Sequence, residues 1–305
     1  MPVAIFTHPD CLRHDPGPDH PETPARLQVL LDRLRNEPAA TLHDAGPADR
    51  ASLLAVHREG YLRSVEALSE AGGGALFLDT ILNRSSWAAA LGAAGAVIAG
   101  VDHVHAGKGH AFAAVRPPGH HALASVGMGF CLVNNAVVGA RHAQRLGRER
   151  VLIVDWDVHH GNGTQDIFWT DDSVFFFSTH QSPHYPGTGE RADIGDGKGT
   201  GFTLNVPLPG GTSGRAHRQA FGDALKEIEG KFHPDLVIIS AGFDSHRDDP
   251  LGNLMLEDAD FAEMTGDVLR IADKHSRGRV VSLLEGGYNL NLLGDSVRSH
   301  LNALL

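Results

Sequence analysis

Short apolar runs alternate along the chain with longer segments in which apolar residues recur at helical spacing. Runs without polar alternation are typical of strands that are buried on both faces of a sheet. The predicted strands are 3–7, 111–115, 151–154, 174–177, 202–206, 236–240 and 279–284. The predicted helices are one that begins near Pro24, then 47–68, 85–105, 134–145, a segment from Thr164 onward, 216–230 and 260–275. Strands and helices therefore alternate over almost the whole chain.

This alternation predicts an α/β fold. Strands separated by helices favour right-handed crossovers and a doubly wound, mostly parallel sheet with helices on both faces. The chain has 305 residues and 42% apolar residues, and no stretch resembles a linker. We therefore expect one domain over 1–305, whose parallel strands end at one common edge, where ligands usually bind.

Polar residues follow most of the predicted strands directly. The clearest stretch is 151–164, VLIVDWDVHHGNGT, in which an apolar run precedes Asp155, Asp157 and His159. These three share one parity, so an extended backbone would direct them to the same side, with neighbours roughly 6.5 Å apart. The residues expected at the carboxyl edge of the sheet are His120, His121, Asp155, Asp157, His159, Ser178, Asp244 and Tyr288.

Three of these residues have the chemistry of a metal site. Asp157, His159 and Asp244 supply three N or O ligands, the number expected for a catalytic zinc ion that keeps a fourth position open for water. Two carboxylates leave such a site roughly neutral, so its water is less acidified than in an all-histidine site and a base is needed.

The remaining residues suit acid–base and oxyanion roles. The tandem His120-His121 fits the need for a base, with Asp155 and Asn162 as candidate partners that orient the two rings. Tyr288 is flanked by Gly286 and Gly287, which would let its loop approach the metal and its phenol donate to an oxyanion.

The composition of the chain indicates which partners and which cellular location to expect. A net charge of −11 argues against a partner such as nucleic acid and suits a cationic or lysine-bearing substrate. Only Cys11 and Cys131 are present, which is consistent with a reducing cytoplasm. The start, MPVAIFTH, lacks the features of a signal peptide, and the apolar stretch 87–101 is shorter than a membrane span and predicts a buried helix. We expect a cytoplasmic protein with no membrane partner.

Six motifs together resemble one known family. RPPGHH, GMGFC, VDWDVHHGNGT, PGTGE, AGFDSH and LEGGYN occur in this order. They resemble the motifs of the zinc-dependent histone deacetylases of the arginase/deacetylase fold. Their sequences are most similar to those of the class II branch and its bacterial histone deacetylase-like amidohydrolases. The resemblance extends from HPETPAR to LEGGYN. It implies one catalytic zinc ion and hydrolysis of acyl groups, chiefly acetyl, from the ε-amine of lysine in a peptide or protein.

The resemblance also implies roles for individual residues. The implied zinc ligands are Asp157, His159 and Asp244. His121 would be the main general base and acid, His120 its electrostatic partner bonded to Asp155, and Tyr288 the oxyanion donor. The walls of the acyl-lysine tunnel would be Gly129, Phe130 and Tyr185, with Asp79 near the substrate backbone. One or two structural potassium ions are implied, the first at Asp155, Asp157, His159, Ser178 and Thr179, the second at carbonyls of Phe168, Asp171, Val174 and Phe202.

Two positions vary within that family. Asn162 stands where the class I branch has Asp, so His121 lacks a carboxylate partner, as is usual in class II. Tyr288 stands where one class II subgroup has His and loses most deacetylase activity. The resemblance therefore implies an active enzyme.

Other functions remain to be weighed. Arginase-like ureohydrolases of the same fold bind two manganese ions and need Asp at the positions of Gly161 and His246. A non-catalytic reader of acylated lysine would not need the complete set of ligands, base and tyrosine. An acetylpolyamine or other small-amide deacetylase would typically carry a long insertion near Asp79, where GGGALFLDTILNRSS is short. The short loop favours an open entrance that admits a peptide. A homo-oligomer is compatible with the sequence.

Overall fold

The computed structural model describes residues 2–35, 37–38 and 40–305, and one parallel sheet forms its centre. The eight strands lie in the order β2 (Ala40–Asp44), β1 (Val3–Thr7), β5 (Ala111–Ala113), β10 (Val280–Leu284), β9 (Leu236–Ala241), β6 (Val151–Asp155), β7 (Val174–Gln181) and β8 (Thr203–Leu208). Every pair in this sheet is parallel. The carboxyl ends of all its strands therefore meet at one edge.

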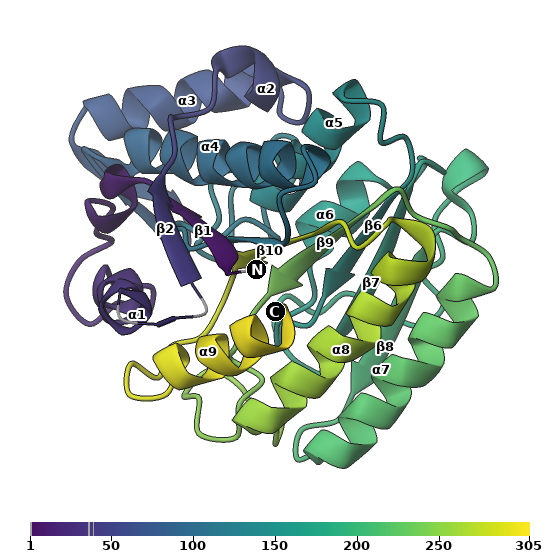
Figure 1. Ribbon diagram of the computed structural model, residues 1–305. Helices are drawn as coiled ribbons and strands as arrows, with labels where there is room; N and C mark the ends of the chain where they lie inside the picture. Colours follow the sequence, from purple (N-terminus) through teal and green to yellow (C-terminus); the bar gives the residue numbers. More distant parts are fainter. Residues whose placement is uncertain (1, 36, 39) are drawn as a thin grey trace.

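Helices cover both faces of the sheet (Figure 1). One layer contains α2 (Arg50–Leu54), α3 (Glu59–Glu70), α4 (Ser86–His105) and α5 (Asn135–Arg145). The other contains α1 (Ala25–Leu34), α7 (Gly214–Glu229), α8 (Asp258–His275) and α9 (Leu293–Ala303). Shorter elements are α6 (Asn162–Ile167) and the 3-10 helices η1 (Pro9–Leu12) and η2 (Gly197–Gly199). The predicted doubly wound α/β fold is confirmed.

The central strands explain the unbroken apolar runs of the sequence. In β6, β9 and β10 every residue is buried, because helices lie against both faces of the sheet. Outer helices such as α7 bury one stripe only, in this case through Phe221, Leu225 and Ile228. This division between fully buried strands and one-sided helices is the pattern that the sequence predicts.

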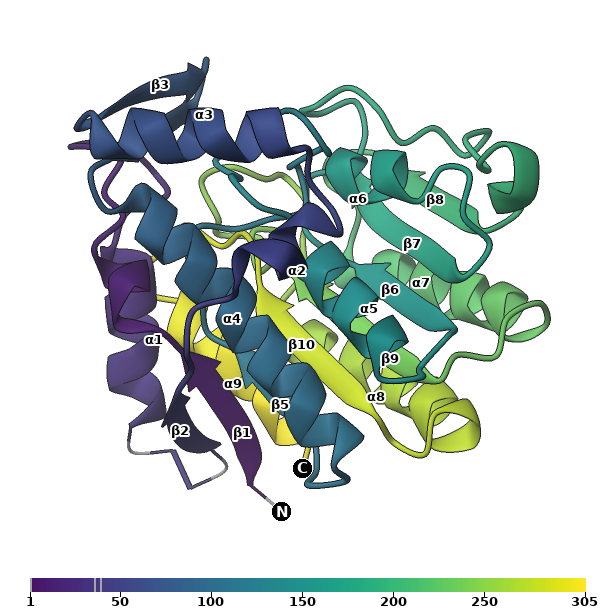
Figure 2. The same cartoon turned by 90° about the horizontal axis from the view of Figure 1, so that it is seen from above.

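Helix α4 (Ser86–His105) extends beyond the apolar stretch 87–101. It is the one helix in the described part of the chain that is long and apolar enough to cross a membrane, by length and composition alone. However, 61% of that apolar window is buried inside the molecule, where α4 packs on β1, β5 and α5 (Figure 2). It is therefore accounted for as a core helix.

One predicted helix is in fact two. The segment 47–68 forms α2 and α3, which are separated by a turn at His57. Both ring nitrogens of His57 bond to main chain, since Nε2 accepts from the amide of Asn134 at 3.0 Å and Nδ1 lies 2.9 Å from the carbonyl of Leu123. These contacts come from distant residues, so local periodicity could not reveal the break.

Other differences concern weakly patterned segments. The predicted loop after Gly72 is an antiparallel hairpin of β3 (Gly73–Phe77) and β4 (Thr80–Asn83), which packs beside α3 (Figure 2). Strand β2 was not predicted, because it is a largely exposed edge strand. Helix α9 was also missed, and β7 continues through Ser178 and Thr179 to Gln181 instead of ending before them.

A buried ion cluster ties the N-terminal segment to the loop after β5. Glu22, Arg26 and Arg116 have fully buried side chains. Glu22 accepts from Arg116 Nε at 2.5 Å and Nη2 at 2.6 Å, and from Arg26 Nη1 at 3.0 Å. Burial by itself would raise the pKa of Glu22, but the two arginines and His14 lower it to about 2. Glu22 is therefore ionised in the folded protein at neutral pH.

Removal of the Glu22 charge should strongly destabilise the fold. Glu22→Gln leaves two buried guanidinium groups without a carboxylate, so the free energy of unfolding at pH 7 should fall by about 3–5 kcal/mol in urea denaturation. Because the folded pKa lies below the usual value, this contribution should be present above pH about 4.5 and fade as the pH falls toward 2. The control Asp295→Asn breaks the half-exposed pair with Arg33 and should cost less than about 1 kcal/mol. Equal losses in the two variants would contradict the assignment.

Candidate active site

Three predicted ligands converge beyond the carboxyl ends of β6 and β9. The ligand atoms of Asp157, His159 and Asp244 all lie within 4.8 Å of one another, and the three residues are buried. His159 Nδ1 is 3.0 Å from Asp157 Oδ1 and 3.3 Å from Asp244 Oδ2. One imidazole nitrogen and two carboxylates therefore face a common point.

Glycine makes this approach possible. A Cβ atom at Gly286 would collide with the carboxylates of both Asp157 and Asp244, and one at Gly242 would collide with Asp157. Gly286 also donates its amide to Asp157 Oδ2 at 2.8 Å. The loop after β10 can therefore pass directly beside the two acids only because it lacks a side chain there.

The electrostatics of this group fit a bound cation. Asp244 Oδ1 accepts from the amide of Val158 at 2.9 Å, whereas Oδ2 is buried and accepts no hydrogen bond from any described residue. Burial and the neighbouring Asp157 raise the pKa of Asp244 to about 7. Burial would lower the pKa of His159, but the neighbouring carboxylates of Asp157 and Asp244 raise it to about 9. A divalent cation at this point would use the free oxygen and offset the repulsion, so the donor set suits zinc.

Asp155 does not join this group. Strand β6 ends at Asp155 and the chain bends there, so the extended backbone assumed from parity is wrong. Asp155 Oδ2 instead lies 3.0 Å from His120 Nδ1, as the sequence predicts for one of the paired histidines. Burial opposes a charge on His120, but Asp155 and Asp157 raise its pKa well above the usual value.

The pKa of His121 is shifted in the opposite direction to that of His120. Its Nδ1 donates to Asn162 Oδ1 at 2.7 Å, which leaves Nε2 as the unprotonated nitrogen. Burial, followed by the neighbouring His120 and His159, lowers the pKa of His121 well below its usual value. The pKa values of the two adjacent imidazoles, whose ring centres are 4.0 Å apart, are therefore shifted in opposite directions.

A cavity of about 220 Å³ leads to these groups. Its walls come from six loops and are formed by Asp79, His121, Gly129, Phe130, His159, His184, Tyr185, Leu251 and Tyr288. Gly129 and Phe130 both have left-handed backbone conformations, at φ 55° and 68°. A Cβ at Gly129 would collide with the ring of His121 and lie 3.1 Å from Tyr185. The predicted wall residues Gly129, Phe130 and Tyr185 thus line one cavity.

Tyr288 enters the cavity on a firmly held loop. Its amide donates to Asp249 Oδ2 at 2.6 Å, and the Arg26 guanidinium lies over its ring at 4.6 Å from the ring centre. Arg26 also donates to the carbonyls of Gly287 and Glu285 at 2.5 and 2.6 Å. Burial raises the pKa of Tyr288 well above its usual range, against the opposing effect of Arg26, so the phenol keeps its proton.

Asp79 lies in the turn of the β3–β4 hairpin. Its Oδ1 accepts from the amide of Gly129 at 3.2 Å and from Thr80 Oγ1 at 3.0 Å. The hairpin is thereby bonded to the tunnel wall, and an acidic side chain lies at the entrance of the cavity.

Sequence reasoning missed several residues of this site. His184 stacks on His159, with ring centres 4.9 Å apart, and its Nε2 lies 2.9 Å from the carbonyl of Leu251. Glu285 accepts from the amides of Gly119 and His120 at 2.7 and 3.2 Å. The signal for His184 was its place beside Tyr185 in SPHYPGTGE, and Glu285 stands in LEGGYN.

The two predicted potassium sites stay predictions. In the first, Asp155 and Ser178 are neighbours in the β6–β7 ladder, and Asp157 and His159 follow on the same loop. In the second, the carbonyl of Phe168 accepts from the amide of Asp171 and that of Phe202 accepts from Phe176. Each carbonyl oxygen retains a second lone pair, so these bonds leave room for a cation.

Comparisons with known proteins agree with this arrangement. A family model described as a histone deacetylase domain matches residues 20–304. A histone deacetylase-like amidohydrolase of Pseudomonas aeruginosa is 42% identical over 94% of this chain and 82% of that protein. A probable deacetylase of Archaeoglobus fulgidus is 40% identical over 95% of this chain and 82% of that protein.

A solved structure supports the same assignment. The crystal structure of the HDA15 HD domain superimposes with a TM-score of 0.93 at 36% identity, over 99% of this chain and 88% of that one. The match covers the sheet, both helical layers and the loops that carry the cavity. The chain belongs to the histone deacetylase family and is a hydrolase of the deacetylase type.

Proposed function

We propose that the protein removes acetyl groups from the side-chain amine of lysine in peptides or proteins, with one zinc ion held by Asp157, His159 and Asp244. The observation that carries this proposal is the convergence of the three ligand atoms at the end of a cavity that His121 and Tyr288 also line. When bound, the ion would polarise the amide carbonyl and increase the acidity of a water molecule.

The chain's own residues would then handle the protons. His121, neutral and with Nε2 unprotonated, is suited to accept a proton from the attacking water and to deliver one to the amine that leaves. Asn162 holds its ring in this tautomer. His120, charged beside Asp155, would favour the developing negative charge of the reacting amide.

Tyr288 would supply a hydrogen bond to that developing charge. Its phenol stays protonated, and its loop is fixed by Asp249 and Arg26. A donor that is already positioned contributes to catalysis because it need not be reorganised during the reaction.

The cavity suits an unbranched aliphatic chain. Phe130 and Tyr185 line it from separate loops, so recognition would come from the lysine stem and the acyl group. The β3–β4 hairpin contributes Asp79 to the lining of the cavity and lacks the long insertion that is typical of acetylpolyamine enzymes, which supports a peptide in preference to a free polyamine. A negative net charge of −11 also favours basic substrates.

Metal removal should abolish activity. Chelation should inactivate the protein, and about one zinc equivalent per chain should restore turnover, because three ligands converge on one point. Asp244→Ala should fail to retain zinc in elemental analysis, whereas Asp248→Ala, on the exposed neighbouring loop, should retain it. Full activity with two manganese ions per chain would refute the single-zinc site and favour a ureohydrolase.

Loss of the Tyr288 hydroxyl should slow catalysis without loss of metal. Tyr288→Phe should lower kcat by about 10²–10³, as for other oxyanion donors, with zinc content and binding of zinc-chelating inhibitors preserved. Tyr185→Phe, which alters a wall of the same cavity, should have a much smaller effect. Unchanged turnover of Tyr288→Phe would exclude the phenol from the reaction.

Substrate preference can be measured directly. Acetyl-lysine peptides, longer acyl-lysine peptides and acetylated polyamines should be ranked by kcat/KM. Acetyl-lysine peptides should exceed acetylpolyamines by at least about tenfold, or roughly 1.4 kcal/mol of transition-state discrimination. The reverse order would identify a polyamine deacetylase and refute the open-entrance argument, while the zinc mechanism would stand.

A further inference from the structure

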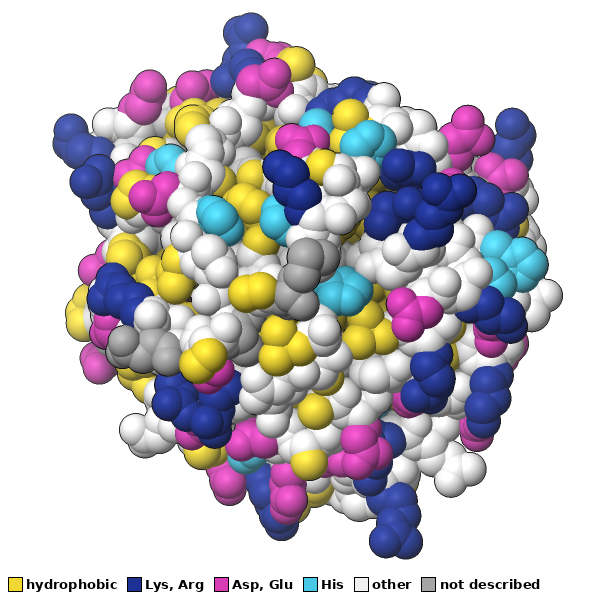
Figure 3. Space-filling view, viewed as in Figure 1, with side chains coloured by type: hydrophobic (Ala, Val, Ile, Leu, Met, Phe, Trp, Pro, Cys, Tyr) yellow, Lys and Arg dark blue, Asp and Glu magenta, His cyan; other side chains and the backbone are white. Residues whose placement is uncertain are grey.

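A second cavity lies at the opposite edge of the sheet from the zinc ligands. It measures about 530 Å³, and we refer to it as the amino-edge cavity. Its walls are formed by loops that precede strands β5, β6 and β10, namely Val104, His105, Ala106, Gly107, Gly109, His110, Arg148, Asp273, Arg277, Gly278 and Arg279. Figure 3 shows Lys and Arg side chains gathered on this face, over the loops that follow α5 and α8 in Figure 1.

The arginines of this cavity are not neutralised. The chain carries 37 acidic and 26 basic residues, yet Arg148, Arg277 and Arg279 form no ion pair with any residue that the structure describes. Arg279 is anchored by its Nε, which donates to the carbonyl of Asp235 at 2.9 Å. Burial and the charges of Arg148 and Arg277 lower the pKa of Arg279, a sign that the three guanidinium groups repel one another.

Buried nitrogens without partners lie in the same place. Arg148 Nε, His105 Nδ1 and His110 Nδ1 are each inaccessible to solvent and bond to no described group. Such groups are rare in folded proteins, and three of them belong to residues that line this one cavity. Because these three atoms are inaccessible to solvent, a ligand in the cavity would contact the guanidinium groups of the arginines and not these nitrogens.

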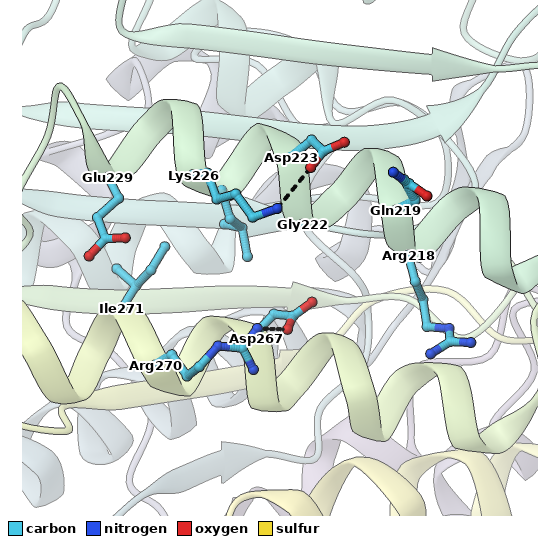
Figure 4. Close-up of a pocket in the computed structure, with 10 residues that line it drawn as sticks. Arg218, Gln219, Gly222, Asp223, Lys226, Glu229, Asp267, Arg270 and Ile271 are labelled. Carbon is cyan, nitrogen blue, oxygen red and sulfur yellow. Dashed lines mark hydrogen bonds and ion pairs between the residues drawn. The ribbon is translucent and has the colours of Figure 1, made fainter.

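The cavity between α7 and α8 is a useful contrast. It measures about 350 Å³ and is also rich in charged residues, but each of these has an ion-pair partner, either within the walls, as Figure 4 shows for two pairs, or just outside them. Lys226 bonds to Asp223 at 3.0 Å, and Arg270 pairs with Asp267. A charged surface of this chain is thus ordinarily self-neutralised, and the amino-edge cavity is not.

We propose that the amino-edge cavity binds a phosphate dianion, either free phosphate or the phosphate group of a small molecule. The cavity is lined by three arginines and one acidic residue, Asp273, and Asp235 lies outside the lining but also interacts with Arg279. The excess of positive charge favours an anion, and a dianion compensates more of it than a monoanion does. Guanidinium groups match the oxygen spacing of phosphate with paired hydrogen bonds. The site is a concave pocket on an acidic chain, unlike the extended basic surfaces that bind nucleic acid.

Titration calorimetry on the zinc-loaded enzyme at constant ionic strength tests this proposal, with inorganic phosphate, AMP and acetate as probes. Phosphate or AMP should bind with a Kd below about 1 mM, and acetate should bind at least about tenfold more weakly. If AMP binds more tightly than phosphate, the source is a nucleoside phosphate; the reverse order indicates phosphate itself. No binding at about 10 mM, or equal binding of acetate, would overturn the site.

Three variants distinguish binding of phosphate in this cavity from nonspecific electrostatic attraction. Arg277→Gln, at an exposed turn, should weaken phosphate binding by at least about tenfold, whereas Asp273→Asn should strengthen it, a change that misfolding cannot produce. Arg150→Gln removes the same charge two residues from Arg148 but outside the cavity, and should alter Kd by less than about twofold. Deacetylase turnover should be unchanged in Arg277→Gln. Equal losses in Arg277→Gln and Arg150→Gln, or no gain in Asp273→Asn, would refute the proposal.

Discussion

Two carboxylates buried side by side are the constraint on which the site depends. Asp157 and Asp244 follow neighbouring strands β6 and β9, and each is fully removed from water. Burial of a carboxylate costs several kcal/mol, and a second one nearby increases this cost. Main-chain amides of Gly286 and Val158 satisfy one oxygen of each acid, and a free oxygen remains on Asp244. A cation is the group that would complete this arrangement, and the glycines at 242 and 286 leave room for the acids to approach.

A buried arginine on helix α1 fixes the loop that carries Tyr288. Arg26, on α1, bonds to the carbonyls of Glu285 and Gly287 and lies over the ring of Tyr288. Its partner Glu22 binds Arg116, which precedes the paired histidines. The loops after β5 and β10 are therefore joined through one buried ion cluster. Stability of the N-terminal segment and the position of the tyrosine are physically coupled, although the two are far apart in sequence.

Sequence patterns located the elements that depend on local apolar runs, but not the features that depend on contacts with distant residues. Fully buried strands such as β6 and β9 were located within about one residue, because their apolar runs have no alternative explanation. The parity argument for Asp155 was wrong because it assumed an extended chain past the last strand residue. The break at His57 and the stack of His184 on His159 depend on partners dozens of residues away or on another loop. The roles of Asp157, His159 and Asp244 were accessible because several motifs pointed to the same edge.

The layered fold also explains why both polar cavities of interest lie at edges of the sheet. Helices cover the two faces, and every residue of the central strands β6, β9 and β10 is buried, so an unpaired charge has no favourable place within the layers. At the carboxyl edge the excess groups are acids, which suit a cation. At the amino edge they are arginines from two separate loops, which suit an anion. Because these arginines are scattered over more than a hundred residues of sequence, only the parallel arrangement of the strands brings them together.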